Sequence, residues 1–289
     1  MSSNNSNQNK DNLLIDLKNP DWRIRANAIY GLKNMVDSKV KLALIDMLND
    51  ENEYVWLATV KALKNFKEKK LADSLIYRLE NSNNDEIRWN AAYYLGEIGN
   101  NKSLDVLHKS LEDESLDVRL NAAKALGKIG DKKSLDFLVK SLNDKEPIVR
   151  KEAISSINLI SPNKPISELK KSLQDKDERV RSLAAILIGK TKTEEAFDEL
   201  LETLKDENHI VRLSTVYALD KIGGKKIIDP LVTALKDPNW EVRLDAVDAL
   251  GKIPTDEAMD PLIETLKDEN HFVRRSAVNA LKNYKNLKR

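Results

Sequence analysis

The chain of 289 residues carries 48 lysines and arginines against 47 aspartates and glutamates, so its formal net charge is close to zero. This balance argues against nucleic acid as the main partner, because binding to phosphates needs a basic surface. The chain contains no cysteine, which excludes thiol catalysis, disulfides and metal sites with cysteine ligands.

Residues 1–11 are polar and of low complexity, and they show no apolar period, so we expect a disordered tail there. Neither a hydrophobic leader nor a segment able to span a bilayer is present in the sequence. These observations favour a cytoplasmic protein that makes no membrane contact.

From residue 12 onward one motif recurs, and it is complete between Asp113 and Gly130. It consists of an aspartate, a Val-Arg pair five and six residues later, two alanines, and a closing Leu-Gly-x-Ile-Gly. Such a fixed period indicates stacked repeats, and it leaves no room for a separate catalytic domain. The arginine position recurs every 31 residues, with one step of 32, at Arg25, Trp56, Arg88, Arg119, Arg150, Arg181, Arg212, Arg243 and Arg274.

Each repeat contains two segments with apolar residues at steps of three and four, the signature of paired helices. Asp-Pro pairs at 229–230 and 260–261 fit helix starts, and Gly99 and Gly130 fit left-handed C-terminal caps. Two places interrupt the rhythm. The extra residue of the 32-residue step lies within residues 81–84, and residues 161–165 replace a regular turn and are expected to bend the stack.

Counted from the arginine, positions −1, +3, +6, +7 and +10 lie on one side of the second helix and form its packing face. Tyr94, at the usually small position +6, is expected in the core. The aspartate six residues before the arginine is expected to cap its turn and to pair with an arginine within or between repeats, forming a ladder. The alternative is a row of acid–base or anion-binding sites. It is weaker because a residue that recurs in every repeat has a structural role that all repeats share.

The motif resembles the HEAT-like repeat of the phycobilisome-lyase type over about residues 13–284. The resemblance implies an all-α fold, a right-handed α-solenoid of about nine 31-residue helix pairs, with the second helices lining a concave face. We therefore expect residues 12–289 to form a single solenoid. Members of this family include bilin lyases, a metal-dependent hydroxylase of a modified lysine, and scaffolds that only bind proteins.

Residues for chemistry are scarce. The hydroxylase relatives bind iron through His-Glu pairs, but none of His108, His209 and His271 is followed by glutamate. There is no phosphate-binding glycine loop and no nucleophile motif. We therefore expect no catalytic residue, metal or cofactor.

The variable positions of the second helix face away from the core. In the first four repeats they carry aromatic, leucine and amide side chains, a composition typical of protein-binding surfaces. The alternative is that Trp56 packs on a neighbouring repeat and the other apolar residues are merely scattered. The candidate groove residues are Asn27, Tyr30, Tyr54, Trp56, Leu57, Trp89, Asn90, Tyr93, Leu120, Asn121 and Lys124.

A second candidate surface is the lysine stripe at position +9, which offers a contact for an acidic partner. It consists of Lys128, Lys190, Lys221 and Lys252. Taken together, the sequence predicts a non-catalytic scaffold, adaptor or assembly factor that holds a protein or peptide in its concave groove. The alternative is a subunit of a lyase-like or hydroxylase-like enzyme of the same repeat family.

Overall fold

The computed structural model describes residues 2–35, 37–63, 69–99, 101–162, 166–253 and 255–287. Every regular element in these ranges is a helix. The chain divides into two compact units, residues 1–141 and 142–289. This division falls within the stretch for which the sequence predicts one solenoid, and ahead of the bend expected at residues 161–165, of which 163–165 lie outside the described ranges.

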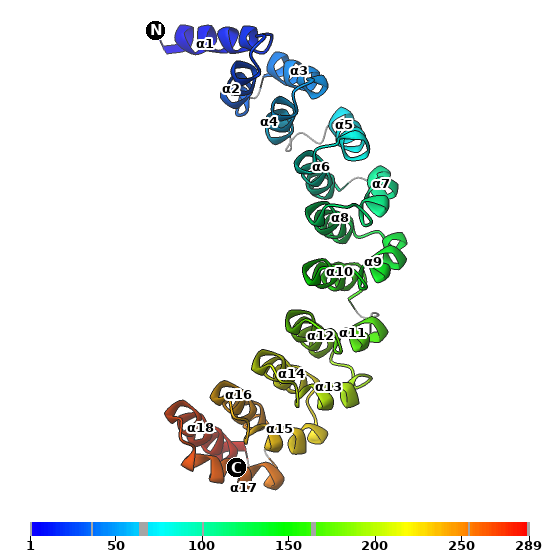
Figure 1. Ribbon diagram of the computed structural model, residues 1–289. Helices are drawn as coiled ribbons and strands as arrows, with labels where there is room; N and C mark the ends of the chain where they lie inside the picture. The colour runs from blue at the N-terminus through cyan, green and yellow to red at the C-terminus, as the bar shows by residue number, and fades with distance from the viewer. Residues whose placement is uncertain are drawn as a thin grey trace. The chain divides into compact units, whose positions relative to one another are not determined.

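In the first unit, helices of successive repeats form two rows (Figure 1). One row holds the second helix of each repeat: α2 (Trp22–Leu32), α4 (Glu53–Leu63), α6 (Asp85–Ile98) and α8 (Leu116–Ile129). The other row holds the first helices α1 (Ser2–Asp16), α3 (Ser38–Asp46), α5 (Lys69–Asn81), α7 (Leu104–Ser110) and α9 (Leu135–Ser141), with short 3-10 turns η1 (Met47–Asn49), η3 (Asn101–Ser103) and η4 (Lys132–Ser134).

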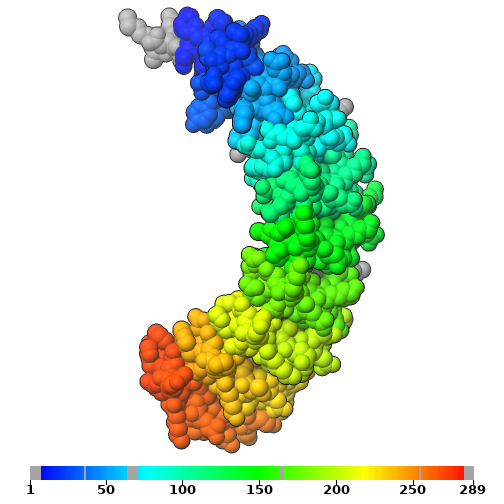
Figure 2. Space-filling view, in the orientation of Figure 1, coloured from blue at the N-terminus to red at the C-terminus, as the bar shows by residue number. Residues whose placement is uncertain are grey.

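The second unit repeats this arrangement. Its row of second helices comprises α10 (Pro147–Ile160), α12 (Glu178–Thr191), α14 (His209–Ile222), α16 (Trp240–Leu250) and α18 (His271–Leu287). Its first helices are α11 (Ile166–Ser172), α13 (Phe197–Thr203), α15 (Ile228–Ala234) and α17 (Asp256–Glu264), with 3-10 turns η5 (Lys225–Ile227) and η6 (Thr265–Lys267). Within each unit the repeats pack into a continuous surface (Figure 2).

The N-terminal helix α1 begins at Ser2, within the segment for which the sequence predicts a disordered tail. Lys10 is half-buried and forms an ion pair with Asp37 of the next repeat, with 3.0 Å between Nζ and Oδ2. Once a helix has formed on apolar residues, polar residues can extend it toward the N-terminus. Each added residue gains one backbone hydrogen bond, so propagation costs much less than nucleation. The packed part of the chain thus begins no later than Lys10.

The predicted packing face is confirmed, with an exception at Ile24, position −1 of the first repeat, which is 37% exposed. In α8, Val118, Ala122 and Leu126 at positions −1, +3 and +7 are fully buried. Neighbouring second helices also approach closely where a glycine at +8 meets an alanine at +6 of the next repeat. A Cβ built on Gly96 would lie 2.8 Å from the Cβ of Ala125, and Gly189 and Gly251 meet their alanines in the same way.

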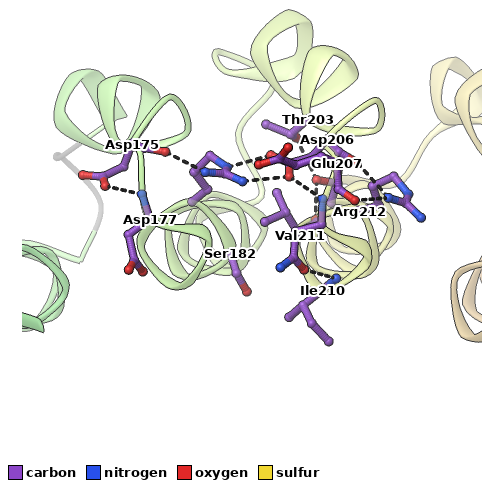
Figure 3. A network of polar contacts seen from close by, with 12 residues as sticks. Asp175, Asp177, Ser182, Thr203, Asp206, Glu207, Ile210, Val211 and Arg212 are labelled. Atoms are coloured by element: carbon purple, nitrogen blue, oxygen red, sulfur yellow. Dashed lines mark hydrogen bonds and ion pairs between the residues drawn. The ribbon is translucent and has the colours of Figure 1, made fainter. Parts of the chain in front are cut away.

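The predicted ladder is also confirmed, and it runs between repeats (Figure 3). Nε and Nη2 of Arg181 donate to the two carboxylate oxygens of Asp206, at 2.7 and 2.9 Å. Nη1 donates to the carbonyl of Asp175 in its own repeat, at 2.8 Å. The Asp206 carboxylate also accepts from the backbone N–H of Asn208, so it caps its turn as predicted. The same pairing joins Arg25–Asp50, Arg88–Asp113, Arg150–Asp175, Arg212–Asp237 and Arg243–Asp268.

Two of the ladder carboxylates, Asp206 and Asp268, are held in the charged state. Burial alone would raise the pKa of Asp206, but the hydrogen bonds from Arg181 and from the Asn208 backbone outweigh it and lower the pKa below its ordinary value. The pKa of Asp268 is lowered by the same balance, with Arg243 as the donor. These two rungs therefore join ionised and hydrogen-bonded groups that are largely buried.

Candidate functional site: an open joint between α4 and α6

The joint between α4 and α6 departs from the ladder. Position 0 of its first repeat is Trp56 in place of arginine, and the capping position of its second repeat is Ser82 in place of aspartate. In a regular rung, the arginine pairs with the capping residue 25 positions later in the sequence, as Arg25 does with Asp50. The step that follows Trp56 is one residue longer, so the capping residue opposite Trp56 is Ser82. The two exceptions therefore belong to one missing rung.

Trp56 is 0% exposed, and its Nε1 donates to Ser74 Oγ of α5 at 2.9 Å. The Arg78 guanidinium lies 5.8 Å from the centre of the indole ring. Its Nη2 donates to the carbonyl of Asp50 at 2.7 Å, a carbonyl that an arginine at position 0 contacts in regular repeats. The prediction that Trp56 binds a partner is therefore wrong: its ring is a core residue, and Arg78 takes over part of the missing role.

Hydrogen bonds from neutral donors to a carboxylate replace the ion pair of this rung. The Ser82 hydroxyl donates to Glu53 Oε1 at 2.7 Å, and Asn84 Nδ2 donates to Glu53 Oε2 at 3.0 Å. Hydrogen bonds to one carboxylate keep α4 and the turn before α6 together. They do so without the bidentate guanidinium geometry that makes the other rungs strong.

Close approach of the helices is prevented at the same joint. Position +6 of α6 is Tyr94, where α8 has Ala125 and α14 has Ala218. The equivalent of Gly96 one repeat earlier is Lys64, which lies outside the described residues. Because the phenol ring needs the space that two small residues otherwise leave, α4 and α6 cannot approach as α6 and α8 do.

A groove of about 740 Å³ adjoins this joint, and we call it the joint groove. It is lined mainly by α2 and α4, with Glu86 and Tyr94 of α6 on one side. Tyr30 and Tyr54 stand on its rim, 70% and 52% exposed. Leu57, only 5% exposed, contributes to its floor. The full lining consists of Ala26, Asn27, Ile29, Tyr30, Lys33, Asn34, Tyr54, Leu57, Ala58, Lys61, Ala62, Glu86 and Tyr94.

Aromatic and cationic contacts hold the rim tyrosines in place. Tyr54 stacks on Trp22 of the previous repeat, with ring centres 5.5 Å apart and planes inclined by 27°. Arg23 covers the Trp22 ring at 5.2 Å, and Lys33 Nζ lies 3.6 Å from the centre of the Tyr30 ring. Such contacts restrict ring motion, so less conformational entropy is lost when a ligand binds.

Of the predicted groove residues, Asn27, Tyr30, Tyr54 and Leu57 line the joint groove. Trp89, Tyr93, Leu120 and Asn121 are half-buried on α6 and α8 outside it, and Lys124 is exposed there. Asn90 was expected to be available to a partner, but it is buried and its Nδ2 donates to the Glu86 carbonyl at 2.7 Å. Asn121 donates in the same way to the Asp117 carbonyl at 2.9 Å.

Sequence reasoning missed several members of the groove. Tyr94 is buried as predicted, 8% exposed, and the sequence does not reveal that it also lines the groove floor. Burial raises the pKa of its hydroxyl, with smaller contributions from Tyr93 and Glu97. Its departure from the small residues at +6 was the signal that could have marked the site.

The lysine stripe at +9 is largely engaged by neighbouring side chains. Lys128 forms an ion pair with Glu97, and Lys252 forms one with Asp220 at 2.7 Å. Lys221 lies 3.5 Å from the same Asp220 carboxylate and 5.2 Å from the Tyr217 ring centre. These contacts connect repeats and leave the stripe less available to an acidic partner than the sequence suggests.

The described part of the chain holds no group of three or more histidine, aspartate or glutamate side chains placed to bind a metal ion. His108 stacks on Phe137 with ring centres 3.9 Å apart, and its Nε2 lies 3.0 Å from Ser134 Oγ. Burial lowers the pKa of His108, so the ring packs between repeats as a neutral group. Within those same residues, none of the helices is both long and apolar enough to cross a membrane.

Paired helices joined by a ladder of ion pairs define an α-solenoid. Family models described as HEAT repeats match residues 11–77, 72–158, 138–220, 166–237 and 228–288, so nearly the whole chain is covered. The chain therefore belongs to the HEAT-repeat family, and the predicted α-solenoid of HEAT-like repeats is confirmed.

Several solved structures are similar. The YibA protein of Escherichia coli shares 24% identity and a TM-score of 0.61 over 89% of this chain and 96% of that one. Kap95p, in a complex with RanGDP, shares 14% identity and a TM-score of 0.66 over 95% of this chain, which spans 45% of that protein. The phycocyanin lyase CpcE–CpcF of Nostoc shares 22% identity and a TM-score of 0.46 over 77% and 92%. No curated protein matches the sequence. At these identities the similarity shows the fold alone.

Proposed function

We propose that this chain is a non-catalytic protein-binding scaffold, adaptor or assembly factor that holds a segment of its partner in the joint groove. The observation that carries the proposal is the pair of exposed, orientated tyrosines, Tyr30 and Tyr54, on the rim of a groove of about 740 Å³ with an apolar floor. Rigid tyrosine side chains offer a large contact area at low entropic cost and are enriched among interface hot spots.

The groove also supports binding through its polar groups. Asn27 and Asn34 line it beside the tyrosines, and amide side chains both donate and accept hydrogen bonds. These amides are placed to form hydrogen bonds with the peptide groups of a partner backbone that lies over the apolar floor. The proposal rests on this surface. The complex of Kap95p with RanGDP adds only that a chain of similar fold binds a protein.

The test compares partner recovery by affinity purification from the native lysate for three proteins: wild type, Tyr30→Ala/Tyr54→Ala, and Tyr77→Ala. Tyr77 is a matched control, because it is 62% exposed on α5 in the other row of helices. We expect the double variant to lose proteins that wild type and the control both retain. Equal recovery by all three folded proteins would disprove the role of the groove.

A further inference from the structure

The surface row at position +5 alternates in character along the first unit. Its members are Tyr30 on α2, Lys61 on α4, Tyr93 on α6 and Lys124 on α8, and we call them the Tyr-Lys row. Tyr30 and Lys61 line the joint groove, and the other two continue beyond it. Position +5 faces away from the packing face, and of the four residues Tyr93 also touches the core, through an edge contact with Tyr94 at 5.1 Å between ring centres.

The two lysines of the row are available. Both are exposed, and neither forms an ion pair among the described residues. Glu97 accepts hydrogen bonds from Lys128 and Tyr93, which lower its pKa, and the charge of Lys124 acts on it more weakly. The groove's own carboxylate, Glu86, lies in the first turn of α6, whereas Lys61 lies in the last turn of α4. The row therefore presents tyrosine rings and exposed lysines in alternation, and Lys33 and Lys128 add further positive charge beside the two rings.

The spacing of the row sets the spacing of a ligand. Packed helices lie about 8–10 Å apart, and ladder rungs hold equivalent positions in register from α2 to α4 and from α6 to α8. The step from α4 to α6 has no rung and is held by the hydrogen bonds to Glu53. An extended peptide advances about 3.3 Å per residue, so about three of its residues correspond to one repeat. Side chains at every third peptide position would meet Tyr30, Lys61, Tyr93 and Lys124 in turn.

We propose that the partner of the joint groove is an extended acidic peptide segment that crosses the second helices along the Tyr-Lys row. It carries an apolar residue and a carboxylate in alternation, three residues apart. The apolar side chains pack on Tyr30 and Tyr93, and the carboxylates pair with Lys61 and Lys124. This inference rests on the proposed protein-binding function and adds the chemistry of the ligand to it.

The test measures fluorescence anisotropy of synthetic peptides with the full-length protein. The first probe carries leucine and glutamate alternately at every third position, with serine and threonine between. In the second probe glutamine replaces glutamate, in the third lysine does, and in the fourth serine replaces leucine. We expect the first probe to bind most tightly, and the lysine probe to bind at least about tenfold more weakly, since two attractive contacts become repulsive.

Variants locate the contact. Lys61→Ala/Lys124→Ala should weaken binding of the glutamate probe by about twofold to thirtyfold, as expected for two exposed ion pairs. It should leave the glutamine probe unaffected, while Lys109→Ala on α7 changes neither. If the glutamine probe binds as tightly as the glutamate probe, the acidic ligand is wrong and the groove function stands. If no probe binds, or if Tyr30→Ala/Tyr54→Ala binds all four like wild type, the proposed function itself is contradicted along with this inference.

Discussion

The most informative perturbation is a pair of variants, Asp113→Ala and Ser82→Ala. They change the same position of the motif, six residues before position 0, in two neighbouring repeats. Asp113 accepts hydrogen bonds from Nε and Nη2 of Arg88, both at 2.9 Å, and from the backbone of Ser115. Arg88 is 8% exposed, so Asp113→Ala leaves a buried guanidinium with only the exposed Glu114, 3.5 Å away, as a counter-charge. Breaking a buried pair in this way typically costs about 3–5 kcal/mol.

Ser82→Ala removes a smaller interaction. Its hydroxyl donates to Glu53, but Asn84 continues to donate to the same carboxylate. The expected loss is about 1.5–3 kcal/mol, the range of one hydrogen bond to a charged group. Taken between the middles of the two ranges, the structure predicts a difference of about 2 kcal/mol between two substitutions at the same position of the motif.

Urea denaturation followed by circular dichroism measures the loss for the whole chain, and amide hydrogen exchange locates it. Hydrogen exchange is needed because stacked repeats can open separately, so a single midpoint does not describe them. Protection in α6 and α8 should fall strongly in Asp113→Ala and only slightly in Ser82→Ala. Equal losses in the two variants would refute the view that the joint between α4 and α6 lacks a ladder rung.

Three further predictions concern stability. Trp56→Ala should destabilise the first unit by about 3–5 kcal/mol in urea denaturation because the buried ring leaves a cavity; a loss under about 1 kcal/mol would contradict its place in the core. Because the pKa values of Asp206 and Asp268 are lowered by folding, the unfolded chain binds protons first as pH falls below the ordinary value of 3.8. The urea midpoint should therefore drop below about pH 4, with a shallower dependence in Asp206→Asn/Asp268→Asn than in wild type. The pKa of His108 is also lowered in the folded chain, so the unfolded chain again binds the proton first as pH falls below the ordinary value of 6.5. The free energy of unfolding should therefore decrease from about pH 7.5 to about 5.5 in wild type, and by less in His108→Gln.

The repeated features of the fold were predictable because each repeat solves the same packing problem. Position +7 is leucine or isoleucine throughout, and Leu126 is accordingly buried. The aspartate and arginine of the motif left open whether they pair within one repeat or between two. In the structure the arginine pairs with the carboxylate of the next repeat, and its Nη1 donates to a backbone carbonyl of its own repeat.

The site was harder to predict because it depends on exceptions that are far apart in sequence. Trp56, Ser82 and Tyr94 each depart visibly from the motif. They become one site only when the pairing across repeats is known. The sequence predicts Trp56 as a surface anchor because it does not show which residues contact the ring. These residues, Ser74 and Arg78, lie on a first helix, and the repeat motif does not specify the register of that helix. The exposed tyrosines were correctly placed on the surface, because their positions follow from the helix period alone.

The most direct test of the central claim is site-specific photo-crosslinking in the native cells. A photoreactive phenylalanine analogue replaces Tyr30 on the groove rim in one experiment and Tyr77 on the opposite row in another, with similar exposure at both sites. If the joint groove holds the partner, position 30 should give a discrete crosslinked product that unlabelled glutamate peptide competes away, and position 77 should not. A product of equal yield from both positions, or from position 77 alone, would contradict the account.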